Sequence, residues 1–564
     1  MSIVRFSYSL GTYHDAVISA LGAMSQSDII ARIWAKDYTV WKQAPDEITN
    51  RLGWLDAPAE MLPQIPQIRA ILEPLISGGI KDVVLLGMGG SSLAAEVFSK
   101  IFGSRPGYPR LHVLDTTDPA LIASTAQKLE LKKTIFLVSS KSGTTLEITS
   151  LFRYFFNLVS KKMDDAAGSH FIIITDQGSP MVKTAQELSL RHTFINNPAI
   201  GGRYSALSMP GIVPATIIGV DVVRLLQNAV NAAQREKNQN NSGKLDNTGA
   251  SLGATLGTLA QMGRDKLTLI MPASFASFGN WLEQLIAEST GKEGKGILPI
   301  TGEEFSEPGA YGNDRVFVIF QDGTKDNSQK IANLAAAGHP VITIESDDIY
   351  ELGAQMFIWE IATAVAAHIL KINPFDQPDV EAAKKHAHRM IAQYKEKKVL
   401  PLNKPTLITD QGDVYGTSNG STIAEALKNF LNQAGVNDYV CLQVYLSPTP
   451  KVDETLRKMR EIIFMKYGLA VTIGYGPRYL HSTGQLHKGD SGNGLFIQLT
   501  ADDLIDVDIP DNFGAENSTL TFGTLKAAQA LGDWQALIDA GRRVIRFHFR
   551  TNPATGLKNL VELL

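Results

Sequence analysis

The chain has 564 residues, of which 44% are hydrophobic, and its 53 basic and 57 acidic side chains give a net charge of −4. This near balance excludes a general affinity for nucleic acid, so any basic site must be local. The length allows about three or four domains with ordinary globular cores.

The cysteine content and the apolar stretches indicate where in the cell the protein is located. The single cysteine, Cys441, cannot form an intrachain disulfide, and the first residues lack the apolar core of a signal peptide. Both features predict a cytoplasmic protein. The best membrane candidate, residues 356–370, is too short to span a bilayer and carries Glu360, so we expect a buried helix there.

Hydrophobic periodicity divides the chain into four expected units. Residues 1–78 predict an N-terminal helical segment, because apolar residues recur there at three- and four-residue spacing. Residues 79–236 and 237–398 alternate short buried strands with helices, which predicts two parallel-sheet α/β domains covered on both faces. Residues 399–564 predict a C-terminal α/β module. The expected strands lie at 82–86, 111–115, 134–138, 171–175, 266–271, 315–320, 341–345, 438–445 and 469–474.

A glycine-rich turn, Gly87-Met-Gly-Gly-Ser-Ser92, lies between the first expected strand and a helix. Glycines let the backbone approach an anion, and a helix N-terminus presents free N–H groups. One alternative is a dinucleotide fingerprint, with Gly87 and Gly89 in its first two positions and Asp115 ending the next strand, although Ser92 replaces the third glycine. A tight structural turn is the other alternative.

A second loop, Ser139-Ser-Lys-Ser-Gly-Thr-Thr145, also follows a buried strand and precedes a helix. Hydroxyls at Ser140, Ser142, Thr144 and Thr145 can donate to phosphate oxygens, as can the loop amides. A nucleotide P-loop would need a different pattern, Gly-x4-Gly-Lys, and a polar helix cap would need only one hydroxyl. The loop therefore predicts a phosphate cradle.

Two charged residues could supply chemistry beside these loops. Glu288 lies in Glu288-Ser-Thr-Gly-Lys292, with Gln284 one helical turn before it, and Arg203 lies in Gly201-Gly-Arg-Tyr-Ser205. A single carboxylate can move a proton between adjacent carbons, and a guanidinium can stabilise the charge that develops on oxygen. The plain alternatives are a surface carboxylate and a structural ion pair. Together with the loops, these residues predict proton transfer on a phosphorylated small molecule.

Five motifs in this order resemble the glucose-6-phosphate isomerase family, whose members contain two sugar-isomerase (SIS) domains. They are Gly-x-Gly-Gly-Ser, Ser-Lys-Ser-Gly-Thr-Thr, Gly-Gly-Arg-Tyr-Ser, Gln-x3-Glu-Ser-x-Gly-Lys and Phe-Asp-Gln-x2-Val-Glu-x2-Lys, between about residues 80 and 395. The flanks, 1–80 and 400–564, resemble those of the isomerase half of transaldolase–phosphoglucose isomerase fusion proteins. The resemblance implies flavodoxin-like SIS domains, a role in glycolysis and gluconeogenesis, and a homodimer. It implies no cofactor, metal, nucleic acid or membrane partner.

The resemblance also implies roles for individual residues. Glu288 matches the base that carries the proton between C1 and C2 through a cis-enediol, and Arg203 matches a residue beside the reacting carbons. Lys384 matches the lysine of the Phe-Asp-Gln segment and could hold ring or hydroxyl oxygens; a solvated helix lysine is the alternative. The implied substrate-binding residues are Gly90, Ser91, Ser140, Lys141, Ser142, Thr145, Gly202, Gln284 and Gln377.

The family also needs a histidine that protonates the ring oxygen when the sugar ring opens. In typical members this histidine lies between the glutamate motif and the late lysine. Here the candidate is His481, in Leu480-His-Ser-Thr-Gly-Gln485, which comes after Lys384; His487 is its competitor. We therefore expect the C-terminal module to supply the histidine.

Two alternative functions stay open at this point. An isomerase that also accepts mannose 6-phosphate would use the same cradle, because a phosphate site does not read the configuration at C2. A non-catalytic SIS regulator would need the cradle, but it would not need Glu288, Arg203 and Lys384 together.

Overall fold

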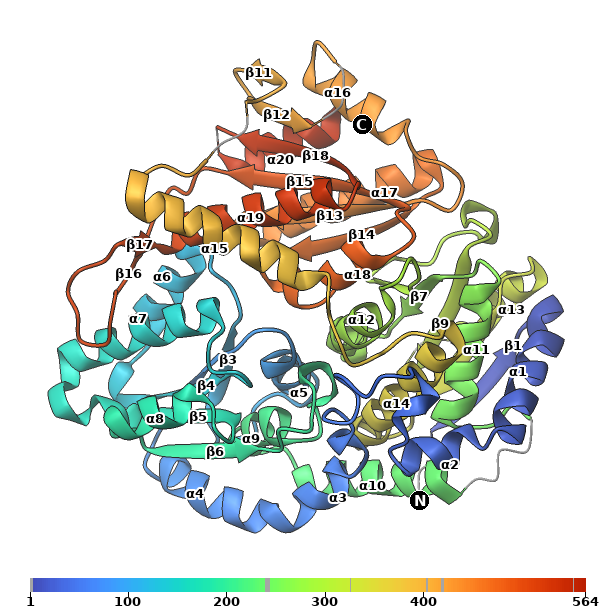
Figure 1. Ribbon diagram of the computed structural model, residues 1–564, viewed down its shortest axis with the longest axis horizontal. Coiled ribbons are helices and arrows are strands. Elements are labelled where there is room, and N and C mark those ends of the chain that lie inside the picture. The colour runs from blue at the N-terminus through green and yellow to red at the C-terminus, as the bar shows by residue number, and fades with distance from the viewer. Residues whose placement is uncertain (1–3, 239–243, 325, 402–403, 417–419, 551) are drawn as a thin grey trace.

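The computed structural model describes residues 4–238, 244–324, 326–401, 404–416, 420–550 and 552–564. In this part of the chain, helices flank three sheets of five or six strands, and a two-stranded ribbon joins β16 (Asp508–Ile509) to β17 (Leu520–Thr521) (Figure 1). Most neighbouring strands of the large sheets are parallel. The α/β class expected from the sequence is confirmed.

The first sheet places the two glycine- and hydroxyl-rich loops side by side. Its strand order is β3-β2-β4-β5-β6, and all neighbouring strands are parallel. Since β2 and β4 are neighbours, the loops that follow them meet at the carboxyl edge, where the strand order reverses and open α/β sheets bind ligands. The strands are β2 (Asp82–Leu86), β3 (Arg110–Leu114), β4 (Thr134–Ser139), β5 (Phe171–Asp176) and β6 (His192–Asn196). The helices are α5 (Leu93–Phe102), α6 (Pro119–Lys128), α7 (Leu146–Met163), α8 (Pro180–Glu187), α9 (Met209–Ile217) and α10 (Val222–Asn238).

The second sheet repeats this arrangement with one difference. Its order is β1-β10-β9-β7-β8, and only β1 is antiparallel to its neighbour. The strands are β1 (Arg5–Ser9), β7 (Lys266–Ile270), β8 (Leu298–Thr301), β9 (Arg315–Gln321) and β10 (Val341–Glu345). The helices are α11 (Gly249–Gln261), α12 (Ala276–Thr290), α13 (Ser328–Ala336) and α14 (Leu352–Leu370).

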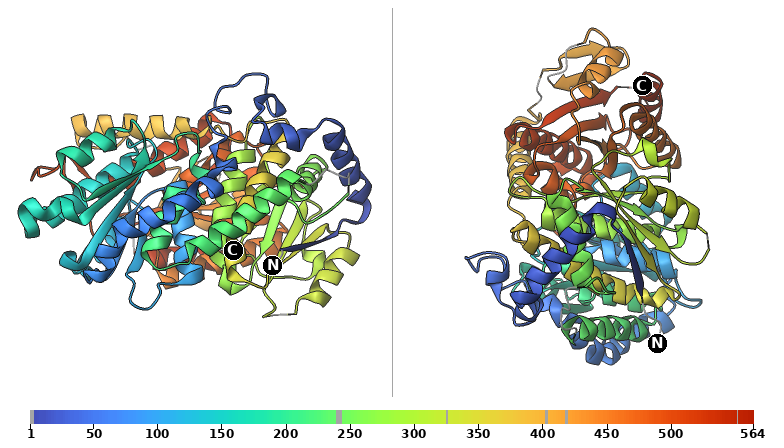
Figure 2. Two further views of the ribbon diagram at one scale, coloured as in Figure 1. Left: turned by 90° about the horizontal axis from the view of Figure 1, so that it is seen from below. Right: turned by 90° about the vertical axis from the view of Figure 1, so that its right-hand side faces the viewer.

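The expectation that residues 1–78 are helical is wrong at their start. Arg5–Ser9 pairs with β10 along the edge of the second sheet, as the dark blue strand in Figure 2 shows. Burial alternates along it, which is the period of a half-buried strand. Helices follow, namely α1 (His14–Gln26), α2 (Ile29–Trp34), α3 (Ala57–Met61) and α4 (Ile65–Ser77).

The C-terminal sheet has the order β11-β12-β18-β15-β13-β14. Neighbours from β18 to β14 are parallel, and β11 and β12 add an antiparallel edge. The strands are β11 (Leu407–Thr409), β12 (Gly412–Gly416), β13 (Tyr439–Tyr445), β14 (Ala470–Tyr475), β15 (Gly494–Ala501) and β18 (Arg543–Phe549). The helices are α16 (Ile423–Leu431), α17 (Pro450–Tyr467), α18 (Gly484–Gly489), α19 (Phe522–Asp539) and α20 (Pro553–Glu562).

Helix α15 (Val380–Lys397) departs from the expected boundary at residue 398. It packs along α19 of the C-terminal unit, above the other two units in Figure 1. The close approach requires a small residue, because a Cβ on Gly532 would lie 2.8 Å from the Ala387 nitrogen and 3.0 Å from the Ala383 oxygen. The second unit therefore ends before α15, and this helix belongs to the C-terminal unit.

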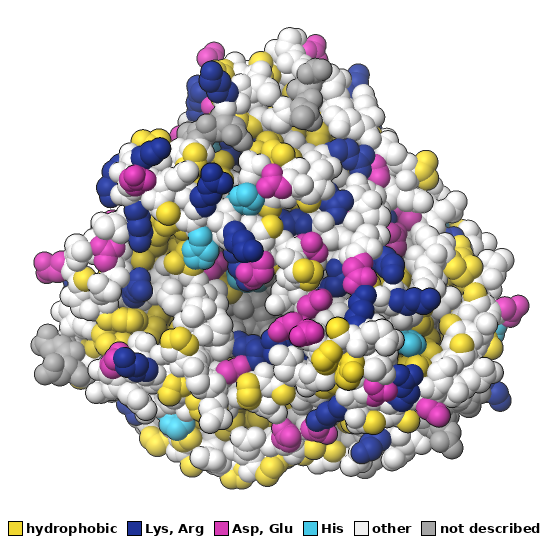
Figure 3. Space-filling view, in the orientation of Figure 1, with side chains coloured by type: hydrophobic (Ala, Val, Ile, Leu, Met, Phe, Trp, Pro, Cys, Tyr) yellow, Lys and Arg dark blue, Asp and Glu magenta, His cyan; other side chains and the backbone are white. Residues whose placement is uncertain are grey.

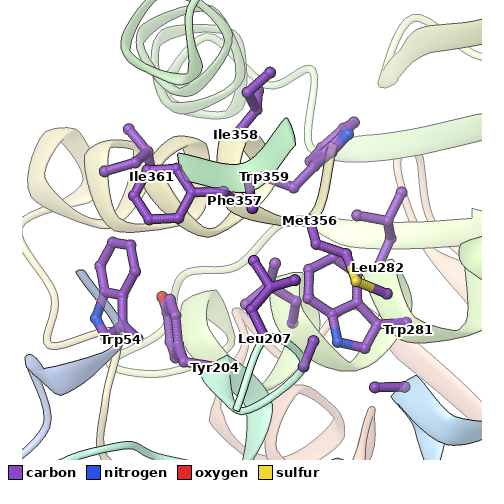
Figure 4. Close-up of a cluster of buried hydrophobic side chains, with 14 of the residues drawn as sticks. Trp54, Tyr204, Leu207, Trp281, Leu282, Met356, Phe357, Ile358, Trp359 and Ile361 are labelled. Carbon is purple, nitrogen blue, oxygen red and sulfur yellow. The ribbon is translucent and has the colours of Figure 1, made fainter. Parts of the chain in front are cut away.

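A buried aromatic cluster joins the N-terminal helices to the second unit (Figure 4). The rings of Trp54 and Tyr204 have centroids 5.0 Å apart, and Trp54 also contacts Phe357 of α14 at 6.0 Å. Tyr204 neighbours Arg203 in sequence, and Trp281 and Leu282 of the same cluster lie on α12. The core thus anchors both segments that carry the predicted charged residues.

One helical stretch in the described residues, Ile349–Leu370, is long and apolar enough to cross a membrane. However, 89% of its most apolar window is buried inside the protein. The expectation of a buried helix at residues 356–370 is confirmed.

Glycines on α11 let this helix lie close against α14. A Cβ on Gly253 would lie 2.3 Å from the Ala362 carbonyl oxygen. We expect Gly253→Ala to lower the free energy of unfolding by about 1–3 kcal/mol, because the overlap outweighs the better helix propensity of alanine. Thermal and chemical denaturation would measure the change.

Gly22→Ala on α1 is the matched control, because a Cβ there meets no atom within 4 Å. It should be neutral or stabilising by about 0.5–1 kcal/mol. Equal effects of both substitutions would contradict the packing argument.

Candidate active site

Four segments meet beside the first sheet because two glycines let their backbones touch. A Cβ on Gly90 would lie only 2.0 Å from the carbonyl oxygen of Gly202. Gly89 has a φ of +55°, and a Cβ on it would lie 2.8 Å from Gln284 Nε2 and 3.0 Å from His481 Cβ. The turn after β2 therefore touches the Gly-Gly-Arg segment, α12 and the C-terminal unit.

The Glu288 side chain is mostly buried and lies next to a fixed guanidinium. Its side chain is 13% exposed, and its Oε1 is 3.4 Å from Arg203 Nη2. Its Oε2 accepts a hydrogen bond of 3.1 Å from Gln284 Nε2, one turn earlier on the same face of α12. The carboxylate is thus oriented and lies close to a permanent positive charge.

Arg203 is 4% exposed and is held from several sides. Its Nη1 donates to the carbonyl oxygens of Glu288 at 2.8 Å and Asp376 at 3.1 Å, and its Nη2 donates to Gln377 Oε1. Gln377 therefore contacts the guanidinium, and the loop before α15 fixes the position of the charge.

His481 enters the same region from the C-terminal unit. Its Nε2 is 3.0 Å from Glu147 Oε1, which also accepts a hydrogen bond of 2.8 Å from Gln529 of α19. Burial raises the pKa of Glu147, but the charge and hydrogen bond of His481 outweigh it and hold that pKa below its usual value. An ionised Glu147 fixes the ring orientation, as carboxylates do for catalytic histidines.

A cavity of about 380 Å³ opens next to His481, large enough for a small ligand. The face in Figure 3 is hollowed near its centre, where charged and histidine side chains gather. Lys384 borders the cavity, and its Nζ pairs with Glu381 at 2.8 Å. The polar residues that line the cavity are Ser142, Thr144, Thr145, Glu147, Glu381, Lys384, Lys385, His388, His481 and Gln529.

The hydroxyl-rich loop divides into two parts. Ser142, Thr144 and Thr145 border the cavity. Ser140 is buried, and its Oγ accepts a hydrogen bond of 3.1 Å from the Gly143 N–H, so it shapes the loop. The Lys141 amine turns elsewhere.

Lys141 forms an ion pair with Asp176 and donates to the Pro198 carbonyl oxygen at 2.8 Å. With Ser91 and Gly202 it borders a separate, very small pocket. The structure therefore keeps Lys141 and Ser91 near the site but outside the lining of the cavity.

Two residues that the sequence offered as alternative site residues, His487 and Asp115, have structural roles. His487 is fully buried, where burial lowers its pKa, and its Nε2 is 3.5 Å from Cys441 Sγ. Asp115 is also buried, 3.3 Å from Arg478 Nη1 and 3.3 Å from Ser92 Oγ. The histidine competitor is thus a core residue, and the acid of a dinucleotide site is already paired.

Sequence reasoning missed Glu147, Gln529 and His388. Glu147 follows the hydroxyl-rich loop directly, and its place at the start of a helix could have marked it. Gln529 and His388 lie in ordinary helical patterns that carry no signal. No group of three or more His, Cys, Asp or Glu side chains among the described residues is placed to hold a metal ion.

Comparison with known proteins relates the sequence of this chain to one family. The family profile described as phosphoglucose isomerase matches residues 66–328. Over these residues, a little under half of the chain, the sequence is similar to the phosphoglucose isomerase family. The match contains the first four motifs; Lys384 and His481 lie beyond it.

Two relatives are similar in sequence, and a solved structure is similar in fold. A probable glucose-6-phosphate isomerase from Methanococcus maripaludis is 27% identical over 385 residues, covering 61% of this chain and 85% of that protein. The glucose-6-phosphate isomerase of Clostridium tetani is 26% identical over 393 residues, covering 61% and 87%. The crystal structure of a Chlamydia trachomatis glucose-6-phosphate isomerase has the same fold, with a TM-score of 0.58 and 20% identity over 70% of this chain and 89% of that chain.

The contact between Gly90 and Gly202 can be tested by adding a methyl group at Gly90. In Gly90→Ala the new Cβ would overlap the Gly202 carbonyl, so the segment carrying Arg203 must move. We expect kcat/KM for the sugar phosphate to fall by about 10²-fold, because displacements near 1 Å at a reacting centre cost that much. Steady-state kinetics on the folded variant would measure it.

Gly201→Ala is the matched control in the same segment. A Cβ there would meet only Arg51 Cδ, at 3.8 Å, so activity should change little. A Gly90→Ala enzyme with normal kcat/KM would show that the contact is not needed.

Proposed function

We propose that the protein interconverts glucose 6-phosphate and fructose 6-phosphate. The observation that carries this proposal is the pairing of Glu288 with Arg203 and Gln284. The Gln284 amide also donates to the carbonyl oxygen of His481, which borders the cavity together with the hydroxyl-rich loop. Relatives named glucose-6-phosphate isomerase support the same reaction.

The first step is ring opening. The substrate phosphate lies against Ser142, Thr144 and Thr145 and the start of α7, where hydroxyls and helix N–H groups favour an anion. His481, oriented by Glu147, gives a proton to the ring oxygen. Lys384, at the edge of the same cavity, holds a substrate oxygen.

The second step moves one proton between carbons. Glu288 takes the proton from C2 of the open aldose and returns it to C1, so the reaction passes through a cis-enediol. The Arg203 charge stabilises the negative charge that develops on the substrate oxygens, and the burial of both groups strengthens this effect. A proton and no hydride is transferred, so the proposed chemistry requires no cofactor.

The presence of this base, cation and acid together favours an enzyme over a non-catalytic sugar-phosphate regulator. We further propose a cytoplasmic location, which the lone buried Cys441 supports. The homodimer stays a prediction. One chain already supplies Glu288, Arg203 and His481.

A coupled assay tests the reaction itself. The purified chain should convert fructose 6-phosphate to glucose 6-phosphate without metal ions or nucleotide in the isomerase step. If the chain converted neither hexose phosphate, the result would contradict the proposed function.

Glu288 should be the base. We expect Glu288→Gln to lower kcat at least about 10²-fold, the lower range for a lost general base, while the substrate still binds. Steady-state kinetics and calorimetric binding of fructose 6-phosphate would measure both. Glu293→Gln removes an exposed carboxylate that pairs with Lys42, and it should leave kcat unchanged. Normal turnover of Glu288→Gln would identify another base.

His481 should act only when the ring is closed. His481→Ala should therefore lose more turnover on cyclic sugar phosphate than exchange of the C1/C2 hydrogen on open-chain substrate. Glu147→Gln should show the same asymmetry, more weakly, because it disturbs the orientation of His481. NMR can follow turnover and solvent-deuterium incorporation together.

His388→Ala, which alters another histidine of the cavity, is the control and should affect both readouts alike. Equal losses in both readouts for His481→Ala would instead indicate that His481 is structural.

A further inference from the structure

A second cavity of about 390 Å³ lies in the C-terminal unit. It is bordered by Tyr445 at the end of β13, by Thr500 and Ala501 at the end of β15, and by His548 on β18. The chain leaves β13 towards β14 and leaves β15 in the opposite direction, towards β18. The cavity therefore lies where the strand order reverses, which is where open α/β sheets bind ligands.

A buried arginine on β18 borders this cavity, and Asp413, the carboxylate whose charge acts on it, already pairs with Arg550. Arg546 is 4% exposed, and no ion pair joins it to a carboxylate in the described part of the chain. Its Nε has no hydrogen-bond partner among those residues. The guanidinium carbon lies 3.9 Å from the Tyr415 ring centre and 5.5 Å from that of Trp534.

Such a position is unfavourable unless something compensates the charge. Burial lowers the pKa of Arg546, but a guanidinium stays protonated in proteins. Stacking on aromatic rings offsets only part of the cost of removing a charge from water. An anion in the cavity would offset the rest.

The other charged groups around the cavity are already occupied. Lys526 pairs with Asp118 at 2.9 Å and with Asp503. His548 Nε2 is 3.3 Å from Asp502, and the Gly523 N–H donates to Asp506 at 2.8 Å. Among the basic residues that line the cavity, Arg546 is thus the one that forms no ion pair with the described residues.

We propose that this cavity binds a small organic anion whose carboxylate or phosphoryl oxygens pair with Arg546. A guanidinium offers two parallel N–H donors that fit either oxyanion. The Thr500 hydroxyl and the carboxylates at the rim suit hydroxyl groups on the rest of such a molecule. This site is separate from the isomerase cavity and does not depend on the proposed reaction.

Helix α19 connects the two cavities. Lys526 and Ala530 border the anion cavity, while Gln529 of the same helix borders the isomerase cavity and donates to Glu147. At the other side, Tyr445 accepts a hydrogen bond of 3.2 Å from Tyr479, two residues before His481. Both contacts lead to His481, so we expect an occupant to change kcat; this consequence, unlike the site, rests on the proposed function.

Calorimetric titration of the full chain tests the site. Malonate and inorganic phosphate are the probes, at constant ionic strength, and they distinguish a carboxylate site from a phosphoryl site. The double variant Ser142→Ala, Thr145→Ala serves as background, so that the loop of the isomerase cavity contributes little binding. At least one probe should bind about tenfold more weakly after Arg546→Gln, because a charged two-donor contact is lost.

Arg550→Gln is the matched control, since Arg550 pairs with Asp413 and lies outside the cavity lining. It should change the affinity by less than about twofold. Equal affinities in the Arg546→Gln and parent chains, or no binding of either probe to the parent, would overturn the site. If Arg546→Gln does not fold, Arg546→Lys replaces it, and unchanged affinity there would also overturn the proposal, since lysine cannot make the paired contact.

Turnover at saturating fructose 6-phosphate tests the connection. The bound probe should change kcat of the wild type and of Arg550→Gln, and it should leave kcat of Arg546→Gln unchanged. An unchanged wild-type kcat with the probe bound would overturn the regulatory part. A chain without isomerase activity would still report on the site through calorimetry, so the two proposals fail separately.

Discussion

The side-chain amide of Gln284 is the contact on which the catalytic geometry depends. Its Nε2 donates to Glu288 Oε2 at 3.1 Å and to the His481 carbonyl oxygen at 2.7 Å. One buried group thus links the carboxylate on α12 to a loop almost two hundred residues later in the chain. Because the amide is nearly inaccessible to water, losing either partner would leave a polar group unsatisfied. The second sheet unit and the C-terminal unit are therefore held in one relative position at this point.

Packing makes this contact possible. Gly89 and Gly90 remove the side chains that would separate the turn after β2 from Gln284 and Gly202. The aromatic cluster around Trp54 and Tyr204 fixes the segment that follows Arg203 (Figure 4). A guanidinium held this firmly needs little reorganisation when charge develops on a substrate. The cost of the tight core is a low tolerance for any added methyl group at these glycines.

Much of the fold was predictable, because buried parallel strands are continuous apolar runs and the loops after β2 and β4 carry their own chemistry. β1 was missed because Arg5–Ser9 is short and gains its stability only from pairing with β10, more than three hundred residues away. The boundary before α15 was misplaced because Phe375 and Lys384 belong to one continuous motif, although tertiary packing divides it. Local patterns carry no information about such long-range pairing.

The candidate site was predictable where a motif names a residue and unpredictable where contacts decide. Glu288, Arg203 and Gln284 come together as expected. The pairing of Glu147 with His481 and Gln529 joins distant segments, and Lys141 turns to Asp176 for reasons of packing that no motif contains. This geometry supports the choice of His481 as the candidate histidine. His481 lies beyond the residues that match the family profile, and it follows Lys384, unlike the histidine of typical family members.

A crystal structure with fructose 6-phosphate bound would test whether the loop after β4, Glu288 and His481 form one substrate site. We expect the phosphate to lie on Ser142, Thr144 and Thr145, with C1 and C2 beside the Glu288 carboxylate and the ring oxygen within hydrogen-bond distance of His481. Substrate bound with its phosphate away from this loop, or with its ring oxygen out of reach of His481, would contradict it.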